Sequence, residues 1–138
     1  MEQTYVMLKP DAVNRGLAGE IISRIEKKGF AISAMTMLVM TEEKAKAHYY
    51  EHVEKPFFPE LLEYITSGPV IGMVVSGPNV IRAMRKMLGA TDPFEADPGS
   101  IRGDYGFSKT MNLVHASDSP ESAAREIALY FTSEQICG

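Results

Sequence analysis

The segment 112–122 contains the side chain best suited to carry out chemistry, His115. The side chains of residues 111–115 are expected to alternate between two sides, as in a strand that ends at the histidine. In such a strand Leu113 lies on the same side as His115, and Asn112 lies on the opposite side. His115 is therefore expected at the end of a rigid element, open to a cleft.

Glu126 can hold this imidazole from a neighbouring helix. Ser119 and Pro120 predict where the helix begins, because serine is a good N-cap and proline a good first helical residue. Glu126 follows Ser119 by seven residues, about two turns, so its carboxylate can reach back to His115 and fix its tautomer. A histidine held in this way can act as a nucleophile. The alternative is a core histidine that caps a neighbouring loop, and the rest of the chain has to decide between the two.

The composition is that of an ordinary globular protein. A length of 138 residues suits one compact domain, 1–138, with 45% hydrophobic and 23% charged residues. No apolar stretch approaches the roughly 20 residues that cross a bilayer, so no membrane partner is expected. The N-terminus lacks the pattern of a signal peptide, and the lone Cys137 excludes an internal disulfide. These features favour a cytoplasmic location.

The net charge of −4 makes nucleic acid an unlikely partner, because such proteins usually carry a basic surface. The same overall charge would repel a nucleotide. Any phosphate site must therefore be a local cluster of basic side chains.

Hydrophobic periodicity predicts alternating strands and helices with no linker or repeat. The expected strands are 4–8, 30–40, 70–75 and 111–115. The expected helices are 17–28, 41–51, 59–65, 79–88 and 120–130. Within 30–40, one side is expected to carry Ile32, Ala34 and Leu38. Glycine, proline and polar residues between 91 and 109 predict a long loop with at most one turn of helix, and such loops are often functional.

This order of elements is compatible with an α+β fold, the ferredoxin-like split β-α-β sandwich. The expected arrangement is a four-stranded antiparallel sheet covered by helices on one face.

The histidine segment, Asn-Leu-Val-His-Ala-Ser-Asp-Ser at 112–119, resembles the phosphohistidine motif of nucleoside diphosphate kinases. Further segments match this family in order, from about Thr4 to Phe131. They are 6–11, 15–17, 19–22, 48–49, 55–58, 67–70, 89–93 and 100–104. The ordered set identifies the chain as a member of the family. The resemblance implies the ferredoxin-like fold and transfer of the γ-phosphate of a nucleoside triphosphate, such as ATP, to a nucleoside diphosphate by a ping-pong mechanism.

The resemblance also implies the catalytic roles. His115 would carry the phosphoryl group as a phosphohistidine, and Glu126 would orient its ring. Lys9 would reach the transferring phosphoryl group and the sugar 3′-hydroxyl, and Tyr49 would stand beside the histidine. Ser117 is expected either to contact the carboxylate of Glu126 or to be a plain turn serine.

Four further residues would bind the nucleotide by the same resemblance. Arg85 and Arg102 would hold the β- and γ-phosphates, Thr91 would donate to the β-phosphate, and Asn112 would contact the 3′-hydroxyl. By residue type alone, Lys9 and the two arginines would each be solvated surface charges. Asn112 precedes His115 by three residues, so a local bend is needed for both to face one site.

The resemblance implies that Phe57 stacks on the base, which would give low base selectivity, while Phe58 is expected in the core. His48 is a further candidate for the phosphates, and His52 is interpreted as a surface residue. Lys109 departs from the family, because it occupies the position of a small apolar residue that covers the other face of the base.

No residue is expected to bind a metal directly. Mg²⁺ would be carried by the nucleotide phosphates, because no carboxylate cluster has metal-binding spacing. The family pattern further implies self-association, with a dimer unit and a tetramer or hexamer. Pro93 matches a loop proline linked with hexamer contacts.

Two other functions are compatible with the predicted fold. One is a catalytically silent ligand-sensing or scaffold domain, which would have no need for His115, Glu126, Arg85 and Arg102 together. The other is nucleic-acid binding through the sheet, which the acidic charge disfavours.

Overall fold

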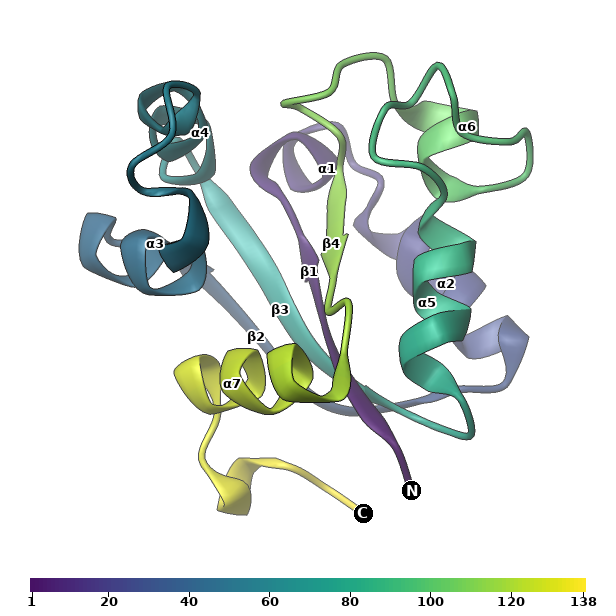
Figure 1. Ribbon diagram of the computed structural model, residues 1–138. Coiled ribbons are helices and arrows are strands. Elements are labelled where there is room, and N and C mark those ends of the chain that lie inside the picture. Colours follow the sequence, from purple (N-terminus) through teal and green to yellow (C-terminus); the bar gives the residue numbers. More distant parts are fainter.

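A four-stranded antiparallel sheet runs through the centre of the computed structural model, which describes residues 1–138 (Figure 1). Its strands are β1 (Gln3–Leu8), β2 (Ala31–Val39), β3 (Pro69–Ser76) and β4 (Val114–Ala116). The order across the sheet is β2-β3-β1-β4, so β1 lies beside the strand that carries His115. The predicted ferredoxin-like α+β fold is confirmed.

Seven α-helices connect or flank the strands. They are α1 (Pro10–Asn14), α2 (Ala18–Lys28), α3 (Glu42–His48), α4 (Phe58–Ile65), α5 (Val80–Leu88), α6 (Ile101–Tyr105) and α7 (Pro120–Tyr130). Two short 3₁₀ helices are η1 (Tyr50–His52) and η2 (Ser133–Gln135). Helix α1 was not expected from the sequence, and the helix expected at 41–51 is divided at Tyr49 into α3 and η1.

Capping side chains set two of the helix starts as expected. Thr41 accepts a hydrogen bond from the backbone N–H of Lys44 at the start of α3, at 3.1 Å. Ser119 accepts one from the N–H of Ser122 at the start of α7, also at 3.1 Å. Each bond satisfies a backbone donor that has no partner within its helix. Helix α7 therefore begins shortly after β4, and its first turns pass close to His115.

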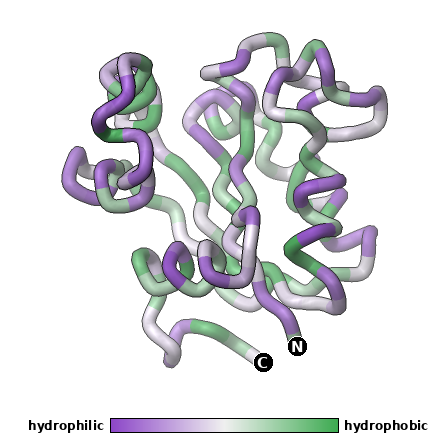
Figure 2. The backbone as a smooth tube through the Cα atoms, in the orientation of Figure 1, coloured by the Kyte–Doolittle hydropathy of each residue, from purple (hydrophilic) through white to green (hydrophobic).

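Helices cover both faces of the sheet, so the expected one-sided arrangement is wrong (Figure 1). Val6 and Leu8 of β1 pack in one apolar cluster with α2 and α5. Tyr5 and Met7 pack in a second cluster with α3, α4 and the region around α7. The alternation of side chains along a strand explains this, because β1 is buried on both sides. Figure 2 shows hydrophobic residues along the central strands, and hydrophobic and hydrophilic residues interspersed along the helices.

A β-bulge in β2 separates side chains that were expected on one side of the strand. The pairing with β3 shifts register between Ile32 and Ala34. Ile32 consequently packs on the cluster with α2 and α5, whereas Ala34 and Leu38 pack on the opposite one. A bulge inserts an extra residue and reverses which side chains face inward. The three were expected on the same side.

Strand β4 is shorter than the expected strand 111–115, because the backbone turns at Leu113, which has a φ of 77°. Leu113 is fully buried in the same cluster as Val114, its immediate neighbour, instead of on the side of His115. Asn112 is thereby turned to the side of His115. The long loop before it contains only the one-turn helix α6, as expected.

None of the helices combines the length and apolar character needed to cross a membrane.

Candidate active site

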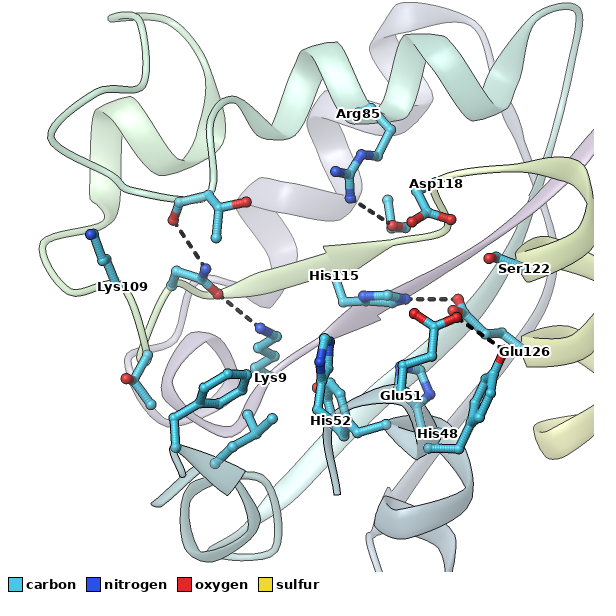
Figure 3. Close-up of a pocket in the computed structure, with 18 of the residues that line it drawn as sticks. Lys9, His48, Glu51, His52, Arg85, Lys109, His115, Asp118, Ser122 and Glu126 are labelled. Carbon is cyan, nitrogen blue, oxygen red and sulfur yellow. Dashed lines mark hydrogen bonds and ion pairs between the residues drawn. The ribbon is translucent and has the colours of Figure 1, made fainter. Parts of the chain in front are cut away.

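His115 lies in the middle of β4, where it pairs with Met7 of β1. Its Nε2 atom is 2.7 Å from Oε1 of Glu126, which α7 projects toward the strand (Figure 3). Because a carboxylate only accepts hydrogen bonds, Nε2 carries the proton and Nδ1 has the free lone pair. The imidazole side chain is 20% exposed, so it is reachable from solvent and is not sealed in the core.

The carboxylate of Glu126 is itself fixed by neighbours. Ser117 donates its hydroxyl to Oε1 at 2.8 Å, so the first of the two interpretations of this serine is confirmed. Arg125 lies 3.4 Å from the other oxygen, Oε2. Burial lowers the pKa of His115, and the hydrogen bond and charge of Glu126 offset part of this effect. The ring is therefore neutral at pH 7, as a nucleophile requires.

All nine of the predicted site residues line one pocket of about 580 Å³. Figure 3 labels Lys9, Arg85, His115 and Glu126 among them. They come from β1, the α3–α4 region, α5, the long loop, β4 and α7. They are Lys9, Tyr49, Phe57, Arg85, Thr91, Arg102, Asn112, His115 and Glu126. The structure thus brings together residues that lie far apart in the sequence.

Lys9 is buried at the end of β1 and not solvated, with 7% of its surface exposed. Its Nζ atom donates to Oδ1 of Asn112 at 2.8 Å, and Asn112 Nδ2 donates to the carbonyl of Thr91 at 3.1 Å. Burial, with the charge of Arg102 as a smaller cause, lowers the pKa of Lys9 to about 7. Its charge is therefore poorly solvated until an anion enters the pocket.

Arg102 is also buried, at 4% exposure, which excludes the interpretation as a surface charge. Its guanidinium donates to three backbone carbonyls, those of Asn112 at 3.2 Å, Gly89 at 3.0 Å and Val114 at 2.5 Å. A guanidinium has five N–H groups, so two remain for a ligand. Arg85 makes one such bond, to the carbonyl of Ala116 at 3.1 Å, and keeps more donors free.

A group of aromatic rings lies beside His115. The ring centroid of His48 lies 4.7 Å from that of His115 in an edge-on arrangement, and Tyr49 lies 4.6 Å from His48. His48 Nδ1 is 2.9 Å from the hydroxyl of Tyr130, while its Nε2 atom has no partner. Burial holds the pKa of His48 well below its usual range, so this ring is uncharged. The buried hydroxyl of Tyr49 also has no partner.

Phe57 and Phe58 divide as expected: Phe57 is 49% exposed on the pocket, and Phe58 is 5% exposed in the interior. His52 is not a simple surface residue, because it is half-buried in the pocket wall with its ring centroid 5.5 Å from that of Phe57. Lys109 also lines the pocket, and its Nζ atom lies 3.8 Å from Oδ2 of Asp92.

Three further residues that were not expected from the sequence, Arg125, Glu51 and Asp118, line the same pocket. Arg125 donates to the carbonyls of Ala47 at 3.1 Å and His48 at 3.4 Å, so it joins α7 to the end of α3. The signals for these residues were only their positions beside Glu126, His52 and Ser117.

One group of side chains has metal-binding proximity. The ligand atoms of His48, His115 and Glu126 lie within 4.8 Å of one another. Lys9 and Arg85 line the same pocket and would repel a cation there. Mg²⁺ prefers oxygen ligands, so two imidazoles and one carboxylate do not suit it. The pocket is built to receive an anion.

Comparison with known proteins agrees with this chemistry. The family model described as nucleoside diphosphate kinase matches residues 2–136. Among relatives named nucleoside diphosphate kinase, that of Methanosarcina barkeri is 60% identical over 136 residues, covering 99% of this chain and 91% of the relative. That of Halalkalibacterium halodurans is 56% identical over 136 residues, covering 99% of this chain and 92% of the relative.

Solved structures give the same result. A halophilic nucleoside diphosphate kinase from Halobacterium salinarum, in complex with CDP, has a TM-score of 0.97 and 46% identity, covering 99% of this chain and 91% of that chain. A nucleoside diphosphate kinase family protein from Babesia bovis has a TM-score of 0.96 and 48% identity, covering 100% and 93%.

Proposed function

The chain belongs to the nucleoside diphosphate kinase family, whose members transfer phosphate between nucleotides, and we propose that it does so through a phosphohistidine on His115. The observation that supports this most is the placement of the imidazole. Its Nε2 atom is bonded to Glu126, and the ring lines a pocket with several cationic side chains. The silent scaffold would have no use for this arrangement.

The nucleophile in this proposal is Nδ1 of His115. It attacks the γ-phosphorus of a triphosphate, the bond between that phosphorus and the bridging oxygen breaks, and the diphosphate leaves. The phosphoimidazole is cationic, and the carboxylate of Glu126 stabilises it through the proton on Nε2. A second diphosphate then attacks the phosphorus with a terminal oxygen, which releases the triphosphate and restores neutral His115.

Three cations neutralise the phosphates in this proposal. Lys9 regains a stable charge when the transferring group approaches, and Arg85 and Arg102 offer their free N–H groups to phosphate oxygens. Positioning and charge neutralisation supply most of the catalysis in phosphoryl transfer, because the chemistry needs little else. We infer that Thr91 and Asn112 add hydroxyl and amide contacts at the same site.

Tyr49 is proposed to act in the same step. Its buried hydroxyl lacks a partner, and its ring lies against His48 beside the nucleophile. A phosphoryl group on His115 would supply the missing acceptor. An unpaired buried hydroxyl is costly, so a ligand that satisfies it gains affinity.

Low base selectivity follows from the character of the base site. Phe57 presents an exposed ring, and stacking on a ring contributes about 1–3 kcal/mol for any base. The substrates would be ATP and other nucleoside tri- and diphosphates, with Mg²⁺ carried on their phosphates as part of the substrate.

Self-association is also proposed. Strand β2 is one of the two edge strands of the sheet, and it exposes Met35, Met37 and Val39. An unpaired edge with large apolar side chains is a liability that a partner subunit removes. A dimer unit within a tetramer or hexamer would cover it.

A labelling experiment tests the central step. Incubation with γ-labelled ATP should give a phosphoenzyme that is labile to acid and stable to alkali, and His115→Gln should abolish it. His52→Gln is the matched control, because that histidine lines the same pocket without a bond to Glu126. Full labelling of His115→Gln would remove His115 from its proposed role.

A further inference from the structure

Leu113 has a backbone conformation that leucine rarely adopts. Its φ is 77°, and the N–H of Val114 donates to the carbonyl of Asn112 at 2.9 Å, which makes a γ-turn centred on Leu113. A γ-turn with positive φ is rare and strained, and no glycine or asparagine occupies the position. Such strain persists only where the surroundings hold it in place.

The turn decides which residues share the pocket. An extended strand would place Asn112 and His115 on opposite sides, because they are three residues apart. With the turn, Leu113 and Val114 both enter the apolar cluster, and Asn112 joins His115 at the pocket. The contact between Asn112 and Lys9 depends on this change.

Both backbone polar groups of Leu113 are held from the other end of the chain. The N–H of Leu113 donates to the carboxylate of Asp11 at 3.1 Å, and the carbonyl of Leu113 accepts the N–H of Lys9 at 2.8 Å. All three residues are buried. The bond that the Leu113 N–H donates to the carboxylate is charge-assisted, and such bonds are roughly twice as strong as neutral ones.

Asp11 is oriented in turn by Tyr64 of α4. The Tyr64 hydroxyl donates to Oδ1 of Asp11, while Leu113 uses Oδ2, so each carboxylate oxygen has a partner. Burial raises the pKa of the Tyr64 hydroxyl, with the hydrogen bond to Asp11 as a further cause, which keeps the hydroxyl a donor. Neither Asp11 nor Tyr64 lines the pocket.

We propose that Asp11, oriented by Tyr64, is a positioning residue that keeps the γ-turn at Leu113 and so aligns Asn112 and Lys9 with His115. This proposal rests on the proposed function, because the alignment matters only if His115 carries the phosphoryl group. Asp11 acts through the backbone and touches no substrate. Loss of its carboxylate lets the turn relax toward an extended strand.

The test compares three variants with a matched control. Asp11→Ala removes both acceptors, Asp11→Asn keeps one, and Tyr64→Phe leaves the carboxylate without its orienting donor. The control is Asp104→Asn, because Asp104 also accepts the backbone N–H of a residue with positive φ, Gly99, at 2.8 Å, but lies outside the pocket.

Two measurements report on alignment separately from stability. The amide proton of Leu113 should resonate downfield in the wild type and move upfield in Asp11→Asn and Tyr64→Phe, because a charged acceptor deshields it. In Asp11→Ala, kcat/KM for nucleoside diphosphate should fall about a hundredfold, as expected for a misplacement of about 1 Å. Asp11→Asn should recover to within about tenfold of the wild type through its remaining acceptor. Asp104→Asn should lower the melting temperature without a change in KM or kcat.

A folded Asp11→Ala or Asp11→Asn variant with an unchanged Leu113 resonance and wild-type kcat/KM would overturn the proposal. If Asp11→Ala does not fold, the Leu113 amide resonance and kcat/KM of Asp11→Asn and Tyr64→Phe test the role of Asp11. The Leu113 resonance needs no phosphorylation. Absence of a phosphohistidine in the wild type would therefore count against the proposed function, and an unmoved resonance against the role of Asp11.

Discussion

The Nζ atom of Lys9 lies 2.8 Å from Oδ1 of Asn112, and this bond joins the end of β1 to the turn before β4. The lysine is buried beside a second cation, Arg102. An ammonium in such a place is held by one amide oxygen until a phosphate arrives. The energetic cost of that charge has a measurable pH dependence.

Lys9→Met should remove this cost. The pKa of Lys9 is lowered to about 7 in the folded protein, whereas the unfolded chain keeps its proton up to about pH 10.4. Between these values the unfolded state binds more protons, so the free energy of unfolding of the wild type should rise with pH relative to Lys9→Met. The slope is at most about 1.4 kcal/mol per pH unit. Urea unfolding of both proteins at pH 7, 8 and 9 measures this slope. If the free energies of unfolding of the two proteins change in parallel with pH, the pKa of Lys9 is not lowered by folding.

Arg102→Lys should impair both stability and nucleotide binding. The arginine bonds three carbonyls at once, and a lysine ammonium cannot span them. Loss of these bonds should lower the free energy of unfolding by about 3 kcal/mol. Arg85→Lys is the matched control, because Arg85 bonds one carbonyl, so its KM should rise with little loss of stability. Denaturant unfolding and steady-state kinetics separate the two effects. An Arg102→Lys variant as stable as the wild type would show that the three carbonyl bonds do not stabilise the fold.

Phe57→Ala should raise KM for every nucleotide to a similar extent. The ring is half exposed, so its loss should change stability little. Stacking of about 1–3 kcal/mol corresponds to a rise of about 5- to 150-fold in KM. Assays with ADP, GDP, CDP and UDP measure the change in KM for each base. Lys109→Leu is the control, because Lys109 lies on the other wall of the pocket. An effect confined to one base would indicate hydrogen-bonded recognition instead of stacking.

The sequence predicted the parts of the site that depend on local signals. Ser119 and Pro120 define the start of α7, and the helical spacing then places Glu126 beside His115. Exposure of Phe57 and burial of Phe58 agree with the expectation from the family motif.

Other features could not be predicted because distant contacts impose them. Nothing in the sequence around Leu113 indicates a turn, and the N–H and carbonyl of Leu113 are held by Asp11 and Lys9, about a hundred residues earlier. Lys9 and Arg102 have the residue types of surface charges, yet the fold buries both. The bulge near Ser33 likewise has no signal such as glycine in the strand.

His115 is anchored in a strand that pairs with the centre of the sheet, so its ring cannot swing between two separate compartments. In the proposed cycle, the donor triphosphate and the acceptor diphosphate must bind one after the other in the same site. The two nucleotides therefore compete for this site. An excess of diphosphate would bind to the unphosphorylated enzyme and slow turnover.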